Sequence, residues 1–356
     1  MPRIALTVDD VDAAFIDEIF GGRGAVRGVS ATKVGTGQVA LSLKLVLDVD
    51  SSCDGIEIPS TLVAKIPSPD AESRAAARMH LTYHKEVGFY TDLADLVTVP
   101  HPRHHHVAID ADSGDFTLVM DHVAGEVGDQ IRGCSIGDAA AFAVAAAGLH
   151  APTWDRVEEL ANPQWLPKPD PGGVVMRSQI FAMLLTGFQE RYVERLDATT
   201  REIAEWLGAN LVALTDSYRL PLCVVHGDYR IDNMLFNRSQ DSVTATILDW
   251  QTVSFGRGPT DVAYGIGSGL LTDDRRRVET DLIDRYTAAL RSSGVSCSDE
   301  DVRWDYRIGT MSGLAMAVIA SQVVTSTERC DEMFAVMAER HAQQMIDNDI
   351  FSIVGG

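Results

Sequence analysis

The chain has 356 residues and a formal net charge of −21, because 51 Asp and Glu outnumber 30 Lys and Arg. This length predicts two domains or one large bilobal unit, since single cores stop growing at about 250–300 residues. Apolar residues make up 46% of the chain and charged residues 23%, which excludes wholesale disorder. The acidity, together with the lack of a dense Lys/Arg cluster, argues against nucleic acid as a partner.

The sequence also predicts the compartment. Residues 1–12 lack the apolar stretch of about 7–15 residues that a secretory signal needs. The apolar window 311–324 is shorter than the roughly 20 residues that span a bilayer, so we expect a buried core helix and no membrane insertion. The five scattered cysteines form no C-x-x-C pair, which argues against a disulfide framework or a zinc ribbon. A cytoplasmic protein is therefore predicted.

The first third of the chain has a strand-rich pattern. Apolar residues alternate from Val39 to Val49, which is typical of a half-buried strand. In chain order, the patterns predict a helix over 8–20, two strand-like runs within 29–50, a strand over 61–66, a helix over 72–96, and a hairpin of 107–109 with 116–120.

The remainder is helix-rich. The alanine-rich segment 136–150 is apolar nearly all round and predicts a buried helix. Further helices are predicted over 177–196 and 200–214, with a proline-rich loop between them and segment 136–150. We therefore expect an α+β fold with two lobes, residues 1–122 and 123–356, and a cleft between them.

The densest chemical signal lies in segment 224–236, where a polar loop separates two apolar stretches. The loop presents Asp228 and Asn233, and a strand-like run ends on Asp249 shortly afterwards. This pattern suits phosphoryl transfer, because the first Asp can orient and deprotonate a hydroxyl while the Asn and the second Asp ligate Mg²⁺ through oxygen. The alternative is that Asp228 and Asn233 merely close a hairpin turn, where both residue types are common.

Two motifs carry a resemblance to a known family. His226-Gly227-Asp228 followed by Asn233 resembles the catalytic loop of the aminoglycoside phosphotransferase and choline kinase-like superfamily, and Ile247-Leu248-Asp249-Trp250 resembles its metal-binding motif. The resemblance implies a protein-kinase-like bilobal fold, with a β-rich N-lobe, a mainly helical C-lobe and the nucleotide cleft between them. It also implies that the γ-phosphate of ATP, or of GTP, moves to an alcohol group of a small molecule, with Asp228 as base and Mg²⁺ on Asn233 and Asp249.

A kinase-like fold needs a lysine on a central strand of the first lobe, paired with a glutamate on a helix. Lys65 is the lone charge in an apolar strand, and burying an ammonium is costly unless it meets an anion. The resemblance assigns Glu86, in segment 84–90, as its partner, and gives both residues a catalytic role. Taken alone, Lys65 could reach solvent at a strand edge and Glu86 could lie on a solvated helix face.

Two further segments bear on nucleotide binding. Gly35 and Gly37 lie between strand-like runs, where small residues let backbone N–H groups approach phosphates, although an ordinary hairpin turn would look the same. Segment 118–125 resembles the interlobe hinge of the superfamily. That resemblance implies that backbone groups of Asp121 and Val123 bond the adenine.

Three groups of residues have supporting or structural interpretations. Asp261 resembles a family Asp whose carboxylate bonds backbone N–H groups of the catalytic loop, with an N-cap as the alternative. The histidines are expected in a solvated loop, not at a metal; they are His101, His104, His105 and His106. The basic run 275–277 is expected on a solvated helix face.

The sequence leaves the chemical class of the acceptor open. The acidic chain would suit a cationic aminoglycoside or choline, whereas apolar, Met-rich helices over 311–337 suit a lipid-like alcohol or plain core packing. Segments 84–90 and 231–234 look closest to the ecdysteroid-kinase-like branch, which favours a hydroxyl acceptor other than an aminoglycoside. The alternatives are an aminoglycoside-type antibiotic kinase, a catalytically silent nucleotide-binding regulator and a metal-dependent phosphohydrolase. No oligomeric state is predicted.

Overall fold

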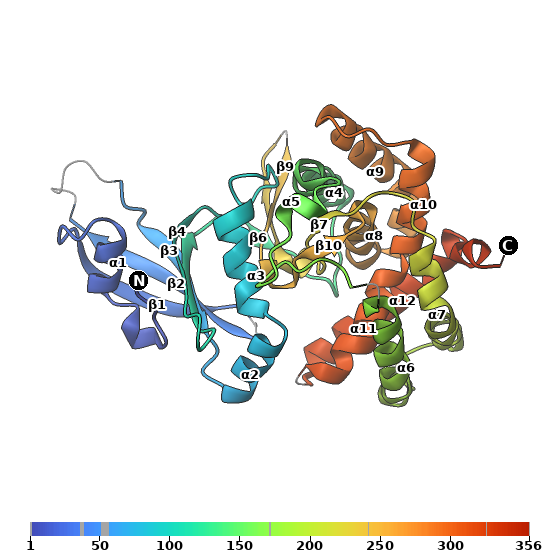
Figure 1. Cartoon of the computed structure of the whole chain (residues 1–356), viewed down its shortest axis with the longest axis horizontal. Coiled ribbons are helices and arrows are strands. Elements are labelled where there is room, and N and C mark those ends of the chain that lie inside the picture. The colour runs from blue at the N-terminus through green and yellow to red at the C-terminus, as the bar shows by residue number, and fades with distance from the viewer. Residues whose placement is uncertain are drawn as a thin grey trace.

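A five-stranded antiparallel sheet forms one end of the molecule (Figure 1). The computed structural model describes residues 2–35, 39–50, 57–170, 172–240, 242–324 and 326–355. The strand order is β1-β2-β3-β5-β4, which makes β3 the central strand. The strands are β1 (Val26–Val34), β2 (Ala40–Val49), β3 (Thr61–Pro67), β4 (His104–Ile109) and β5 (Phe116–Asp121).

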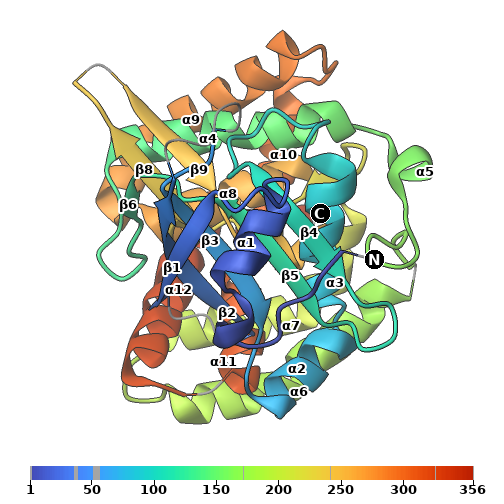
Figure 2. The same ribbon diagram turned by 90° about the vertical axis from the view of Figure 1, so that its left-hand side faces the viewer.

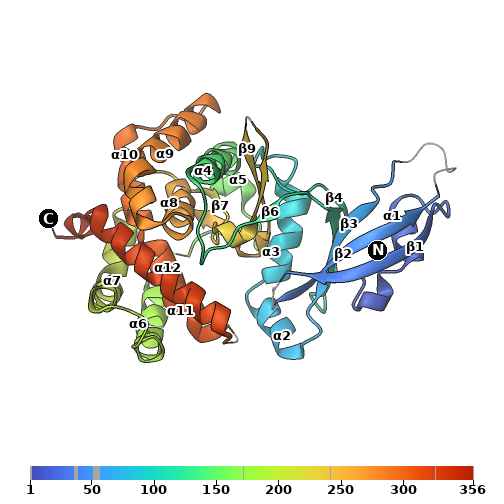
Figure 3. The ribbon, with the colours of Figure 1, turned by 180° about the vertical axis from the view of Figure 1, so that it is seen from behind.

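The two faces of β3 have different surroundings. Leu62 and Ala64 lie in a buried apolar cluster with Phe15 of α1 (Ala13–Ile19), the helix that Figure 2 shows lying over the sheet. Because successive side chains of a strand point to opposite faces, Lys65 points away from α1. That opposite direction is toward α3 (Thr82–Gly88), which Figures 1 and 3 show between the sheet and the rest of the molecule.

The prediction of one continuous helix over 72–96 is wrong, because the helix is interrupted at Leu81. Leu81 has φ 56°, a left-handed conformation that ends α2 (Ala71–Met79) and starts α3. A π-helical turn, Phe89–Leu93, follows. Gly88 then lies against the indole of Trp165, since a Cβ built on Gly88 would come within 2.1 Å of that ring. This close approach fixes α3, and with it Glu86, against the C-terminal part of the chain.

The C-terminal part is mainly helical and contains two small sheets. One sheet pairs β7 (Cys223–Val225) with β10 (Ser254–Gly256), and the other has the order β6 (Glu126–Val127), β8 (Met234–Arg238), β9 (Val243–Ile247). Helix α4 has the bounds predicted for the alanine-rich segment. The helices are α4 (Ile136–His150), α5 (Val157–Leu160), α6 (Gly173–Arg191), α7 (Ala198–Asp216), α8 (Gly258–Gly269), α9 (Thr272–Ser292), α10 (Asp299–Gly309), α11 (Met311–Val323) and α12 (Glu328–Asp347).

Two sequence predictions fail in this architecture. Three of the four histidines expected in a loop, His104 to His106, belong to strand β4. The basic run 275–277 is not wholly solvated, because Arg275 is buried with an ion pair to Glu279 and another to Asp347. Among the described residues, none of the helices combines the length and apolar character needed to cross a membrane.

Candidate active site

Lys65, Glu86 and Asp249 meet although they come from three distant elements. Lys65 Nζ donates a hydrogen bond to Asp249 Oδ1 at 2.8 Å and forms an ion pair with Glu86. The exposed side-chain fraction is 2% for Glu86, 13% for Lys65 and 27% for Asp249, so the most open side of the cluster is the Asp249 side. The structure thus brings β3, α3 and the end of β9 to one point, as a kinase-like site requires.

The two carboxylates keep the lysine charged. Burial alone would lower the pKa of Lys65, but the negative charges of Asp249 and Glu86 outweigh burial and raise it. Burial is also the largest influence on Glu86 and raises the pKa of its carboxyl, opposed by the charge of Lys65. Two acidic partners contact the Lys65 ammonium directly, so Lys65 is charged at neutral pH.

The position of Asp249 depends on its neighbours in the chain. Its backbone is left-handed, with φ 66°, and its Oδ2 accepts a hydrogen bond from Gln251 Nε2 at 2.8 Å. The next residue, Trp250, stacks on Phe89 with ring centroids 3.6 Å apart and planes 4° from parallel. Phe89 directly follows α3, so this stacking ties the Asp249 loop to the helix that carries Glu86.

Asp228 lies in the loop after β7 and is held by three side chains. Arg230 Nε lies 3.1 Å from both carboxylate oxygens. Tyr264 donates its hydroxyl to Oδ1 at 2.9 Å, and Asn233 Nδ2 donates to Oδ2 at 2.9 Å. Burial tends to raise the pKa of Asp228, but the charge of Arg230 and its hydrogen bonds lower it overall, so the group is a carboxylate at neutral pH.

Asp261 supports this loop from α8. Its Oδ2 accepts the backbone N–H of His226 at 2.6 Å and its Oδ1 accepts that of Gly227 at 3.1 Å, so the expected contact of Asp261 with the loop that carries Asp228 is confirmed. Nε2 of the His226 ring contacts the carbonyl of Leu248 at 2.8 Å, and the backbone carbonyl of His226 accepts a hydrogen bond from the Thr252 hydroxyl. The loop carrying Asp228 is therefore fastened to the segment carrying Asp249.

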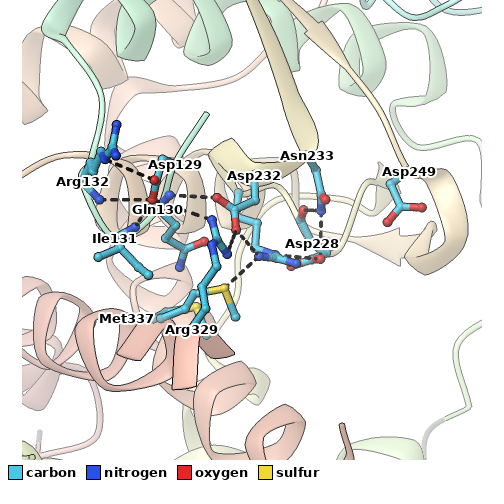
Figure 4. Close-up of polar contacts among 12 residues, drawn as sticks. Asp129, Gln130, Ile131, Arg132, Asp228, Asp232, Asn233, Asp249, Arg329 and Met337 are labelled. Carbon is cyan, nitrogen blue, oxygen red and sulfur yellow. Dashed lines mark hydrogen bonds and ion pairs between the residues drawn. The ribbon is translucent and has the colours of Figure 1, made fainter. Parts of the chain in front are cut away.

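Asn233 and Asp249 offer oxygen ligands at the same end of the β8–β9 hairpin. The backbone N–H of Leu248 donates to the Asn233 carbonyl at 2.9 Å, which places Asn233, directly before β8, beside the segment after β9 that carries Asp249 (Figure 4). Asp249 already faces an ammonium group, so its surroundings accommodate positive charge. An amide and a carboxylate oxygen suit Mg²⁺, which binds few protein groups and keeps water or phosphate oxygens. Within the described chain, no cluster of three His, Cys, Asp or Glu suited to a metal occurs.

The predicted nucleotide contacts are described only in part. Gly35 has φ 74°, which favours glycine, whereas Gly37 lies outside the described residues. The backbone N–H of Asp121 donates to the Arg103 carbonyl at 2.8 Å, and its side chain contacts His105 at 2.6 Å. The Asp121 N–H is therefore not free to bond the adenine. The predicted adenine contacts are then the carbonyl of Asp121 and the backbone of Val123.

Arg230 and Tyr264 are the contacts of Asp228 that the sequence analysis missed. Arg230 follows Asp228 by two residues, so a charged residue inside the motif was the available signal. Tyr264 lies on α8, three residues after Asp261, and so on nearly the same face of that helix. Only the packing of α8 against the loop brings its hydroxyl to Asp228.

Comparison with known proteins defines the class. The model of the phosphotransferase enzyme family matches residues 55–294, more than half of the chain. The chain belongs to this family, so the predicted superfamily and the assignment as an enzyme are confirmed.

Solved structures share the protein-kinase-like fold. The GDP complex of aminoglycoside 2′-phosphotransferase-IIIa is 16% identical with a TM-score of 0.51, covering 92% of this chain and 96% of that one. The ethanolamine kinase of Plasmodium vivax is 9% identical with a TM-score of 0.52, covering 92% and 84%. The macrolide 2′-phosphotransferase MphH of Brachybacterium faecium is 14% identical with a TM-score of 0.50, covering 87% and 91%. The predicted fold class is therefore confirmed.

Curated relatives match over shorter stretches. Acyl-CoA dehydrogenase family member 11 of Gallus gallus is 27% identical over 166 residues, which is 41% of this chain and 20% of the relative. A probable acyl-CoA dehydrogenase of Arabidopsis thaliana is 43% identical over 63 residues, which is 18% of this chain and 7% of the relative. The chain spans at most a fifth of these relatives.

Proposed function

We propose that this phosphotransferase moves the γ-phosphate of ATP or GTP to a hydroxyl group of a small molecule. The observation that carries the proposal is the contact of Lys65 with Glu86 and Asp249, which joins the sheet to the segment after β9. A charged lysine beside two carboxylates is the arrangement that phosphate positioning needs. Residues 1–122 would form the nucleotide lobe and 123–356 the catalytic lobe, in a cytoplasmic protein.

Lys65 and the residues around it would hold the nucleotide. Lys65 binds the α- and β-phosphates and Glu86 keeps its ammonium in place. Gly35, Gly37 and the hinge backbone would contact phosphates and base. Asn233 and Asp249 would hold Mg²⁺, which when bound neutralises charge on the transferring phosphate. Lys65 and Asp249 must then separate enough to admit the phosphates between them.

Asp228 would act on the acceptor. Tyr264 and Asn233 each donate to one carboxylate oxygen of Asp228, and Arg230 Nε faces both oxygens, which fixes the side chain. The acceptor hydroxyl would share one of these oxygens with its present donors. The hydroxyl oxygen attacks the γ-phosphorus as the bond to the bridging oxygen of the leaving diphosphate breaks. Its proton passes to Asp228, whose lowered pKa keeps it ionised before the reaction.

Replacement of Asp228 by Asn tests this role. The amide keeps the size of the side chain but cannot take a proton, so transfer should fall by about 10²–10⁴-fold. Nucleotide affinity, measured by calorimetry, should change less than about threefold, because Asp228 lies on the acceptor side in this scheme. Near-normal transfer by the Asp228→Asn variant would remove the residue from the chemistry.

Three rival functions make different predictions. A catalytically silent regulator would bind nucleotide but transfer phosphate to none of a broad panel of alcohols. A metal-dependent phosphohydrolase would release phosphate from monoesters without nucleotide, and the Lys65–Glu86 pair would then have no role. An aminoglycoside-type kinase would prefer polycationic acceptors. The curated relatives share too small a part of their length for dehydrogenase activity to be proposed.

A further inference from the structure

A polar cluster extends from Asp228 away from the proposed metal ligands (Figure 4). Arg230 Nη1 donates to Asp232 Oδ2 at 3.0 Å, and Asp232 Oδ1 accepts the backbone N–H of Gln130 at 2.8 Å. Segment 128–133, between β6 and α4, is thereby connected to the catalytic loop. The first half of α12 joins it, because Arg329 of α12 lies 3.5 Å from Asp232.

The acidic and basic members of this cluster differ in how well they are satisfied. Asp129 Oδ1 accepts the backbone N–H of Ile131 at 3.0 Å, and Asp232 accepts from Gln130 and Arg230. Arg132 and Arg329, by contrast, approach carboxylates only at 3.5–3.7 Å, and neither guanidinium donates a hydrogen bond within the part of the chain that the structure describes.

Both arginines are open to solvent. The exposed side-chain fraction is 85% for Arg132 and 47% for Arg329. Each guanidinium carries five N–H donors in a planar fork that matches a carboxylate or phosphate. In a chain with a net charge of −21, two arginines with spare donors, in the part of the cluster away from Asp228 (Figure 4), therefore offer positions for an anionic group.

Gln130 gives an independent indication of a ligand. Its side chain is fully buried, and neither its Oε1 nor its Nε2 has a hydrogen-bond partner among the described residues. An unsatisfied buried polar group costs about 1–3 kcal/mol, so such atoms call for an occupant. Figure 4 shows the amide pointing to the side of the cluster where Arg329 and Met337 lie.

Two methionines of α12 form the apolar part of this region. Met333 Sδ lies 3.1 Å from Arg230 Nη1, and Met337 Sδ lies 3.5 Å from the Tyr264 hydroxyl that contacts Asp228. Methionine side chains adapt to ligands of varied shape. Both methionines are buried, so an acceptor that reaches from Asp228 toward Arg329 would contact them only when their side chains move aside.

We propose that the acceptor is an alcohol with an anionic group, a carboxylate or a phosphate, which Arg329 and Arg132 bind while the hydroxyl lies at Asp228. The inference rests on the proposed function and names its substrate class. The Gln130 amide would bond a polar group between the two ends of the acceptor. An ammonium-bearing acceptor is disfavoured, because the arginine side chains, 85% and 47% exposed, are more open than those of Asp129 and Asp232, which are 35% and 13% exposed.

A matched set of three alcohols tests the proposal: 6-hydroxyhexanoate, 6-hydroxyhexanamide and 6-aminohexan-1-ol, each with ATP and Mg²⁺ and the full chain. We expect kcat/KM to be highest for the carboxylate, by about tenfold or more over the amide, since charge-assisted hydrogen bonds are about twice as strong as neutral ones. Arg329→Gln should remove this preference through KM, with kcat nearly unchanged. Arg285→Gln, which alters an exposed arginine paired with Asp281 on α9, is the matched control and should keep it.

Binding of the non-reacting analogues hexanoate and hexylamine, measured by calorimetry, separates this inference from the proposed function. Hexanoate binding that weakens in Arg329→Gln supports the anionic subsite even if no phosphate is transferred, in which case the kinase assignment fails alone. Transfer to all three alcohols at equal rates, a preference for the amine, or no binding of hexanoate overturns the subsite and leaves the kinase assignment standing.

Discussion

Two clusters in this protein place one cation between two carboxylates, but they are assembled differently. Lys65 lies between Glu86 and Asp249, whose elements are far apart in the sequence. Arg230 lies between Asp228 and Asp232, all within one loop of five residues. The first cluster therefore depends on how the sheet packs against the C-terminal part, whereas the second depends on the conformation of a short segment.

This difference predicts different consequences of substitution. The stacking of Phe89 on Trp250 and the approach of Trp165 to Gly88 hold the Lys65 cluster between the sheet and the C-terminal part. Substitutions in this cluster should therefore lower stability and activity together. The second cluster is braced by Asp261 through backbone hydrogen bonds, so its own side chains can change with less effect on folding.

Lys65→Met should have the largest effect. It removes the cation that would position the phosphates and leaves Glu86 buried without a partner, which destabilises a protein by about 3–5 kcal/mol. We expect transfer to fall by about 10³-fold or more, the range of a lost phosphate contact in phosphoryl transfer. Denaturant unfolding and a phosphate-transfer assay measure the two effects.

The double variant Lys65→Met/Glu86→Leu separates the effect on stability from the effect on phosphate transfer. An apolar pair of similar volume can replace a buried ion pair at little expense in stability, so unfolding should return toward the wild type while transfer stays low. Recovery of transfer in the double variant would mean that Lys65 is only a structural partner of Glu86.

Asp261→Ala should come next, and Asp305→Ala is its matched control. Both aspartates are buried and each accepts two consecutive backbone N–H groups: Asp261 those of His226 and Gly227, Asp305 those of Arg219 and Leu220. Each loss should destabilise the fold by about 1–3 kcal/mol for every N–H left unsatisfied.

The rate of phosphate transfer, measured well below the melting temperature, distinguishes the Asp261→Ala variant from the Asp305→Ala variant. Only Asp261→Ala should reduce it, by about 10–100-fold, since displacing a catalytic group by about 1 Å can change the rate on this scale. Equal transfer in the two variants would mean that Asp261 has no role in positioning the catalytic loop.

Arg230→Gln should have the smallest effect on folding of these changes. It removes the charge that contacts both oxygens of Asp228 but leaves the bonds from Tyr264 and Asn233, so we expect about 10–100-fold lower kcat, since a misoriented catalytic group loses rate on this scale. The nucleotide KM should not change, because Arg230 lies on the acceptor side. A raised nucleotide KM with unchanged kcat would assign Arg230 to the nucleotide instead.

The sequence predicted the parts of this site that short motifs encode. The motifs around Asp228, Asn233 and Asp249, together with the family resemblance that they carry and a lone Lys65 in an apolar strand, led to the prediction that these residues converge. The alanine-rich run gave the bounds of α4, although this helix is not buried all round, since Ile136 and Val144 are exposed. In each case the signal lay within a few residues of the chain.

The sequence did not predict features that depend on tertiary contacts. The break at Leu81 has no glycine or proline to mark it, and the contact of Tyr264 with Asp228 needs α8 to pack against the loop. Arg275 looked solvated because one of its two acidic partners, Asp347, lies 72 residues away. Burial of a charge by a distant partner leaves no local pattern.

The most direct test uses a metabolite extract supplied with ATP or GTP whose γ-phosphate carries an ¹⁸O label, followed by mass spectrometry. We expect the wild-type protein with Mg²⁺ to label a specific alcohol, and the Asp228→Asn variant to label it at a rate at least about 10²-fold lower. Labelling that proceeds equally in Asp228→Asn, or release of labelled phosphate to water with no phosphorylated alcohol, would contradict it.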